Sequence, residues 1–319
     1  MMLKTFLIVA LVAFLFSFVF SIILIPILRK IKAGQNILSY VKEHKKKSGT
    51  PTMGGLAFVF AALLSTALFM GKANQPLIVT LAIGLSYMAV GLMDDFLKKK
   101  HKENLGLKAG QKFFFQACIA VLAGIFCLRN GFTFLYIPFT KLKWELGFWM
   151  FPLVVFVFLA TVNAVNLTDG LDGLASSVSI PFFLTLGVLI FLQGDTYGIS
   201  SLCFALVGAL LAYLLFNVSP ACVFMGDTGS LALGGFASCI AVFTGNALYI
   251  LVVGIAFVLS VVSVLLQVIY YKATGGKRIF LMAPIHHHFQ EKGYSESKIS
   301  YAYFLVTFLL GAVCVLTAL

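Results

Sequence analysis

Long apolar segments separated by short polar ones run through the whole sequence. Each of about ten segments holds roughly 20 predominantly apolar residues, the length that crosses a bilayer core as a helix. The alternation of a transmembrane β-strand is absent, so helices are the structure that satisfies the backbone inside lipid. We therefore predict an all-α integral membrane protein that forms one polytopic membrane domain over residues 1–319. The predicted spans are 3–28, 53–70, 76–97, 113–129, 148–165, 176–193, 198–216, 229–245, 247–271 and 300–319.

Three segments depart from this simple pattern. Gly residues interrupt the apolar pattern of 229–245. The loop 130–147 alternates on both sides of a Pro-Phe pair, which predicts a small β-hairpin on the outer surface. The first span has only Lys4 ahead of it and no small-residue cleavage site, so we interpret it as a retained helix.

Basic residues are distributed unevenly between the two ends of the predicted helices. The formal net charge is +12, and 18 of the 23 Lys and Arg residues lie in the segments 29–47, 98–112 and 272–298. Cytoplasmic loops carry such an excess, so these segments face the cytoplasm and both termini lie outside. Anionic lipid headgroups add a second attraction for these residues. The charge is therefore no indication of nucleic-acid binding.

Other ionisable residues gather on this cytoplasmic face, which holds nine of the eleven carboxylates and all five histidines. A fold alone requires no such gathering, whereas a chemical site at the boundary between water and lipid does. The sequence has no Walker-type loop and no Ser-His-Asp constellation. Acids that bind Mg²⁺ and cations that neutralise phosphate are instead the components of phosphoryl transfer.

Asp94 and Asp95 close the predicted third span. Acids at a helix C-terminus oppose the macrodipole, and adjacent acids repel each other unless cations are near. The lysines that follow supply such cations. Ionisable groups at a membrane boundary favour a functional interpretation. The alternative is a helix end that simply meets water.

The segment 163–173 contains two Asn and two Asp but no basic residue. Asp169 and Asp172 are three residues apart and share a face if the segment is helical. Asn163 and Asn166 suit recognition of a hydrogen-bonding ligand. A turn with helix caps is the alternative, whereas a calcium loop needs more oxygen ligands than this segment offers.

Asn217 and Asp227 flank the next cytoplasmic segment. Gly226 and the small residues after Asp227 allow a bulky ligand or a metal to approach this carboxylate. One carboxylate together with phosphate oxygens and waters is a common way to hold Mg²⁺. The alternative is that Asp227 caps the helix that begins near Ser230.

His286, His287 and His288 are consecutive, so they cannot all converge on one tetrahedral zinc from an ordinary helix or strand. Hydrogen bonds or charge donated to phosphates fit their basic surroundings better. Lys47 and Thr52 precede the second span and suit an anion. Lys47 is equally explained as one more lysine of the cytoplasmic face.

Five motifs together resemble a known family. They are Gly49-Thr-Pro-Thr-Met-Gly-Gly, Gly91-Leu-Met-Asp-Asp, Asn166-Leu-Thr-Asp-Gly-Leu-Asp-Gly-Leu, Phe224-Met-Gly-Asp-Thr-Gly-Ser and Ala283-Pro-Ile-His-His-His-Phe. From about residue 29 onward the chain resembles the phospho-N-acetylmuramoyl-pentapeptide transferases. These are polyprenyl-phosphate phosphosugar transferases that make the first lipid intermediate of bacterial peptidoglycan. The family usually continues the last motif with Glu, where this chain has Gln290.

The resemblance implies a homodimer in the bacterial cell membrane, with ten helices, outward termini and a cytoplasm-facing cleft. It implies transfer from UDP-N-acetylmuramoyl-pentapeptide to undecaprenyl phosphate, with Mg²⁺ required and UMP released. One of Asp94 and Asp95 would then act as base or nucleophile, and Asp227 would bind the metal. His286 and His287 are the other two positions assigned to catalysis. The positions implied or chosen for substrate binding are Lys47, Thr52, Lys112, Asn166, Asp169, Asp172, Asn217, Phe224, Gly226, Gln267 and His288.

Two other functions fit parts of the sequence. A sister transferase acting on another UDP-sugar shares most of the motifs, although the histidine motif differs in relatives that transfer N-acetylglucosamine-phosphate. A secondary transporter also uses intramembrane acids, but it places ions near the midplane and commonly has paired halves. No repeat is evident here, so the transporter is the poorer alternative.

Overall fold

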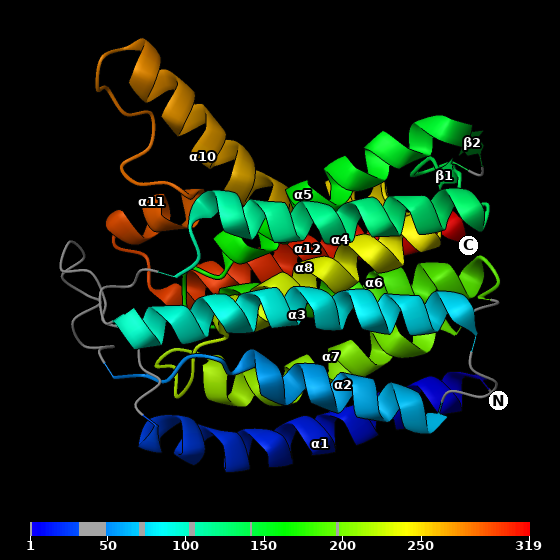
Figure 1. Ribbon diagram of the computed structural model, residues 1–319, viewed down its shortest axis with the longest axis horizontal. Coiled ribbons are helices and arrows are strands. Elements are labelled where there is room, and N and C mark those ends of the chain that lie inside the picture. The colour runs from blue at the N-terminus through cyan, green and yellow to red at the C-terminus, as the bar shows by residue number, and fades with distance from the viewer. Residues whose placement is uncertain (1, 32–48, 70–73, 102–105, 141, 196–197) are drawn as a thin grey trace.

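The protein is a bundle of helices that run roughly parallel to one another (Figure 1). The computed structural model describes residues 2–31, 49–69, 74–101, 106–140, 142–195 and 198–319. Lys47 therefore lies outside the described residues. The helices are α1 Met2–Lys30, α2 Gly55–Phe69, α3 Gln75–His101, α4 Ala109–Arg129, α5 Met150–Thr168, α6 Leu174–Leu192, α7 Ile199–Asn217, α8 Gly226–Phe243, α9 Tyr249–Val253, α10 Ile255–Ala273, α11 Ile285–Glu291 and α12 Glu296–Ala318.

These helices confirm the predicted membrane architecture. Nine of the described helices are long and apolar enough to cross a membrane, and α2 is a shorter apolar helix of 15 residues. The predicted span 247–271 is divided at Gly254 into the short α9 and the long α10. The third span also differs from expectation, because α3 continues to His101. Asp94 and Asp95 thus lie inside the last two turns of α3 rather than at its end.

The Gly-rich segment 229–245 forms α8, the most enclosed of the spanning helices. About 89% of its apolar window is buried inside the protein, against 28% for α1, α4 and α12. Its small residues allow close packing: a Cβ on Gly234 would lie 2.5 Å from Val162 Cα, and one on Gly235 would lie 2.6 Å from the Tyr87 ring. The low hydrophobicity of this segment is thus explained by protein on all sides instead of lipid.

The outer hairpin is also confirmed. Strands β1 (Phe134–Tyr136) and β2 (Lys143–Glu145) pair antiparallel, with Leu135 opposite Trp144, and the 3₁₀ turn η2 (Gly147–Trp149) leads into α5. The Lys143 ammonium lies 5.0 Å from the centres of the Phe134 and Tyr136 rings, a cation–π contact. The hairpin lies at the same end of the bundle as both chain termini (Figure 1).

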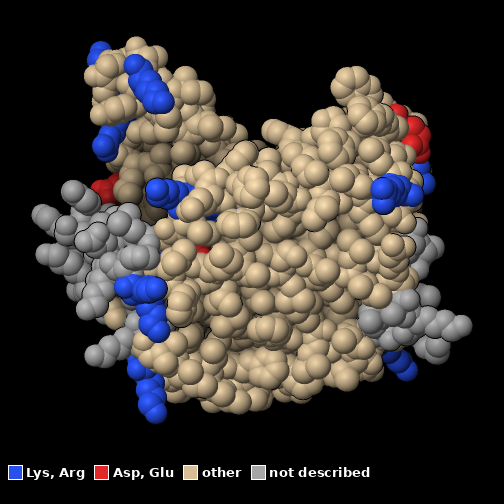
Figure 2. All heavy atoms as spheres, viewed as in Figure 1, with Lys and Arg blue, Asp and Glu red and all other residues tan. Residues whose placement is uncertain are grey.

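The opposite end of the bundle carries the candidate chemistry. Lys and Arg gather mainly at this end, at the left in the view of Figure 2. There α11 packs against α10 and α12, and α10 leaves the bundle and projects away from it (Figure 1). By the positive-inside rule this end faces the cytoplasm.

Candidate active site

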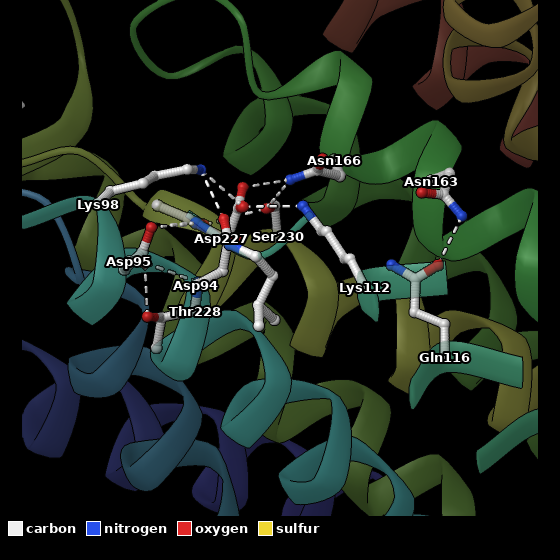
Figure 3. A network of polar contacts seen from close by, with 12 residues as sticks. Asp94, Asp95, Lys98, Lys112, Gln116, Asn163, Asn166, Asp227, Thr228 and Ser230 are labelled. Atoms are coloured by element: carbon white, nitrogen blue, oxygen red, sulfur yellow. Dashed lines mark hydrogen bonds and ion pairs between the residues drawn. The ribbon is translucent and has the colours of Figure 1, made fainter. Parts of the chain in front are cut away.

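Three carboxylates meet where α3 packs against the beginning of α8. Asp94 and Asp95 come from α3 and Asp227 from the first turn of α8, and one carboxylate oxygen from each lies within 4.8 Å of the others. Asp94 and Asp95 are buried, and Asp227 is partly exposed. We call these three residues the acid cluster (Figure 3).

Two lysines neutralise the acid cluster. The Lys98 ammonium lies 2.7 Å from Asp94 Oδ2 and 2.9 Å from Asp227 Oδ2, so it joins the two carboxylates. Lys112, from the first turns of α4, lies 2.8 Å from the same Asp227 oxygen. Both lysine side chains retain some exposure, 23% and 19%. Two ammonium groups thus stand beside three carboxylates, and the side chains that carry the positive charge are the ones that reach solvent.

Asp95 faces the N-terminus of α8. Its carboxylate accepts hydrogen bonds from the backbone N–H of Asp227 at 3.2 Å, from the backbone N–H of Thr228 at 3.0 Å and from the Thr228 hydroxyl at 2.6 Å. The first N–H groups of a helix lack partners within the helix and carry its positive dipole end. Asp95 thus caps α8 from a different helix and is completely buried in doing so.

Asp94 has different neighbours. Its Oδ1 accepts the Leu107 backbone N–H at 2.7 Å, and its Oδ2 contacts the partly exposed Lys98. The loop ahead of α4 is held against Asp94, because a Cβ on Gly106 would nearly overlap its carboxylate. Of the two adjacent acids, Asp94 is the one linked to groups that reach solvent.

The close approach of α8 depends on Gly226 and on the segment before α2. Gly226 has a φ of +71°, which favours glycine. A Cβ there would lie 2.5 Å from both Asp95 Oδ2 and Thr52 Oγ1. The segment is fixed by backbone hydrogen bonds, from Phe224 N–H to Pro51 at 2.8 Å and from Gly54 N–H to Phe224 at 2.9 Å. Thr52 is buried here, and its hydroxyl has no hydrogen-bond partner among the described residues.

Asn166, at the end of α5, joins the acid cluster as the sequence predicted. Its amide nitrogen donates to Asp227 Oδ1 at 2.7 Å and to the Ser230 hydroxyl at 2.8 Å. Asn163, which the sequence also offered for ligand recognition, instead donates to Gln116 Oε1 on α4 at 2.8 Å (Figure 3).

The histidines lie against the turn between α5 and α6. A Cβ on Gly170 would lie 2.4 Å from His286 Nε2 and 3.0 Å from His287 Nε2, so both rings direct these nitrogens toward the turn. His286 is fully buried, and within the part of the chain that the structure describes neither ring nitrogen has a hydrogen-bond partner. Burial, reinforced by His287, lowers the pKa of His286 to about 3, so this ring is neutral. Burial and then nearby carboxylates raise the pKa of Asp169 in the same turn.

Four other residues of the predicted site hold backbone segments in place. Asp172 accepts the Ala221 N–H at 3.0 Å, and Asn217 donates to Val223 O at 3.0 Å. Gln267 Oε1 accepts the Phe280 N–H at 2.9 Å. His288 Nδ1 accepts the Leu281 N–H at 3.1 Å. These bonds shape the loops 218–225 and 277–284 around the site, and their direct contact with substrate remains a prediction.

Lys98 is the principal residue that the sequence did not single out. It was one lysine among several on the cytoplasmic face, but it lies at the centre of the acid cluster. The available signal was its spacing: Lys98 follows Asp94 by four residues, which places both on one face once α3 continues past Asp95.

Comparison with known proteins agrees with this geometry. The model for glycosyl transferase family 4 matches residues 77–245, which include the acid cluster and both lysines. A phospho-N-acetylmuramoyl-pentapeptide-transferase signature matches residues 47–59. The chain is 44% identical to the phospho-N-acetylmuramoyl-pentapeptide-transferase of Listeria monocytogenes serotype 4b (strain CLIP80459), over 95% of this chain and 94% of the relative. The chain belongs to this transferase family.

Similar relatives come from other bacteria. The phospho-N-acetylmuramoyl-pentapeptide-transferase of Clostridium botulinum (strain Eklund 17B / Type B) is 43% identical, over 94% of this chain and 92% of the relative. That of Clostridium perfringens (strain 13 / Type A) is 42% identical, over 93% of both. Together with the apolar helices, these relatives identify a multi-pass bacterial membrane protein with transferase activity.

Proposed function

We propose that this protein transfers phospho-N-acetylmuramoyl-pentapeptide from its UDP-linked donor to undecaprenyl phosphate, forming lipid I and releasing UMP. The observation that carries the proposal is the acid cluster with Lys98 and Lys112 in contact, at the lysine-rich end of a transferase of this family. The acceptor phosphate lies at the headgroup plane and the nucleotide arrives from the cytoplasm. A site at the cytoplasmic helix ends is where the two meet.

The reaction exchanges one phosphoanhydride bond for another. A phosphate oxygen of the lipid attacks the sugar-linked phosphorus of the donor, and the bond between the two phosphates of UDP breaks as UMP leaves. Such transfers depend on positioning and on neutralising the charge of the phosphate oxygens. Lys98 and Lys112 supply that positive charge. Asp94 is the better candidate of the pair to accept a proton from the lipid phosphate, because it contacts the partly exposed Lys98, whereas Asp95 is completely buried against the N-terminus of α8.

The acid cluster suits a divalent cation. Carboxylate oxygens are the ligands that Mg²⁺ prefers, and three lie close together here. The Lys98 ammonium between Asp94 and Asp227 occupies a position that already suits a positive charge. We propose Asp227 as the principal Mg²⁺ ligand, with Asp94 beside it. When bound, the ion would neutralise the diphosphate and ease departure of UMP.

Recognition of the donor is assigned to groups that retain hydrogen-bonding capacity. The Thr52 hydroxyl and the His286 ring nitrogens are buried without hydrogen-bond partners among the described residues; Thr52 lies beside Gly226 and His286 beside Gly170. Lys47, Asn166, Asp169, Asp172, Asn217, Phe224, Gly226, Gln267 and His288 stay as proposed substrate-binding positions by resemblance to the family. Homodimer formation is likewise proposed, and the mass of the purified protein in a defined detergent tests it.

The decisive experiment compares two labelled donors. Purified protein, undecaprenyl phosphate and Mg²⁺ are incubated with either UDP-N-acetylmuramoyl-pentapeptide or UDP-N-acetylglucosamine, and the lipid product is extracted. We expect product with the first donor alone, and none from Asp227→Ala. Product from UDP-N-acetylglucosamine alone would establish a sister transferase instead. No product from either donor, together with uptake of a donor into sealed vesicles, would favour a transporter.

The same preparation separates direct attack from a covalent route. In a covalent route an aspartyl carboxylate would attack the donor first and release UMP before any lipid is present. We expect no UMP from wild type when undecaprenyl phosphate is omitted. A stoichiometric burst of UMP that Asp94→Asn abolishes would overturn direct attack.

A further inference from the structure

A chain of hydrogen bonds joins His287 to the beginning of α12. His287 Nδ1 lies 3.0 Å from Gln290 Oε1, and Gln290 Nε2 donates to Glu296 Oε1 at 3.3 Å. The second oxygen of Glu296 accepts the backbone N–H of Asp172 at 2.8 Å. Gln290 is 7% exposed, so the chain runs through the protein interior.

The direction of every bond follows from its two ends. A backbone N–H only donates, and an ionised carboxylate only accepts. The Glu296 oxygen beside Gln290 can only accept, so the amide nitrogen of Gln290 must face it. The Gln290 oxygen then faces His287 and requires a donor there. Nδ1 of His287 must therefore carry the proton, and its Nε2 in the neutral ring must be bare.

We propose that Gln290 and Glu296 are positioning residues that hold His287 as the Nδ1–H tautomer. The bare Nε2 lies toward the Gly170 turn at the border of the site. An unprotonated imidazole nitrogen accepts hydrogen bonds, so a hydroxyl or amide, of the protein or of the donor substrate, is the kind of group that Nε2 would bind. This nitrogen would not donate to a phosphate. This functional consequence rests on the proposed function, whereas the tautomer itself does not.

Reversing the direction of these hydrogen bonds tests the proposal. In Glu296→Gln the new amide must accept from Asp172 with its oxygen, so it offers N–H to Gln290. Gln290 must then turn its own nitrogen toward His287, and the tautomer inverts to Nε2–H. In the double variant Gln290→Glu/Glu296→Gln, a carboxylate accepts from both sides and the original tautomer returns. Each variant replaces like-sized side chains, so steric effects are matched.

The readout is the ¹⁵N spectrum of histidine-labelled protein in detergent, with the His287 signals identified by their loss in His287→Gln. We expect Nδ1–H in wild type, Nε2–H in Glu296→Gln and Nδ1–H again in the double variant. Transfer activity should fall about tenfold or more in Glu296→Gln and recover in the double variant, the range typical when an orienting partner of a histidine is lost. Glu291→Gln is the control, because it makes the same change of charge at an exposed residue at the end of α11, five residues before Glu296.

Several outcomes would overturn the proposal. An Nε2–H tautomer of His287 in wild type would contradict the proposal directly. An unchanged tautomer in Glu296→Gln would show that the hydrogen bonds through Gln290 do not determine it. A double variant that folds but shows the inverted tautomer excludes the relay through Gln290. If wild type transferred neither labelled donor, the proposed function would fail while the spectra still decided the tautomer.

Discussion

Gly91 lies where α3 crosses the beginning of α8, directly behind the acid cluster. A Cβ at this position would lie 2.0 Å from the backbone oxygen of Asp227 and 2.7 Å from the backbone nitrogen of Thr228. Ordinary contact begins at 3.4 Å, so in Gly91→Ala the two helices must separate by about 1 Å or more. The atoms that this Cβ would meet all belong to the backbone of α8, so no flexible side chain can move aside to make room.

We expect two measurable consequences of Gly91→Ala. Overpacking of this kind costs about 1–3 kcal/mol, so the melting temperature in detergent should fall. The separation also stretches the bonds from Asp95 to α8, of which the shortest is 2.6 Å. Misplacement of reacting groups by about 1 Å lowers rates by up to about 100-fold, so lipid product formation should fall by that order.

A matched control is available on α4. Gly110 is also helical, but a Cβ there would have none of the described residues within 4 Å. Gly110→Ala should therefore leave activity unchanged and stabilise the helix slightly. The reasoning would be refuted if folded Gly91→Ala kept the wild-type rate, or if both alanine variants lost activity equally.

Four further outcomes follow from the site. Lys98→Met should lower the transfer rate at least about 100-fold, because Asp94 and Asp227 lose the cation that they share. Lys100→Met, at an exposed position of the same helix, should leave the rate unchanged, and equal rates for the two variants would contradict the role of Lys98. Removal of divalent ions with EDTA should abolish transfer and Mg²⁺ should restore it, whereas activity in EDTA would exclude the metal. Asp95→Ala leaves up to three donors unsatisfied at α8, so its melting temperature should fall below that of Asp94→Ala; the reverse order would exclude the capping role. The pKa of His286 is about 3, so the unfolded chain takes up a proton at this residue below about pH 6.5 while the folded protein does not. Wild type should therefore lose about 2 kcal/mol of stability to this residue by pH 5, and His286→Leu should not; a difference in melting temperature that does not change with pH would contradict this.

The helices were predictable because length and apolarity determine membrane spans almost independently of packing. The acid cluster was less predictable. Asp94 and Asp227 are separated by more than 130 residues, and the charge pattern placed both only on the same face of the membrane. Their assignment to one site came from the family motifs. Lys98 could not be separated from its neighbouring lysines, since the positive-inside pattern gives the same signal for all of them. The backbone-holding bonds of Asn217 and Gln267 depend on loop conformations that residue type alone does not specify.

The adjacent acids of α3 illustrate why loss of activity alone does not assign a catalytic base. Successive side chains on a helix point about 100° apart, so Asp94 and Asp95 make different hydrogen bonds although both carboxylates lie close to Asp227. Asp95 holds the first N–H groups of α8, and it thereby fixes the position of Asp227 in that same turn. Asp94 contacts Lys98 and lies toward solvent-accessible charge. We expect substitution of either acid to lower the transfer rate, but only substitution of Asp95 also removes the hydrogen bonds that hold the N-terminus of α8. The melting temperature, measured together with the rate, therefore distinguishes the residue that positions the site from the residue proposed to accept the proton.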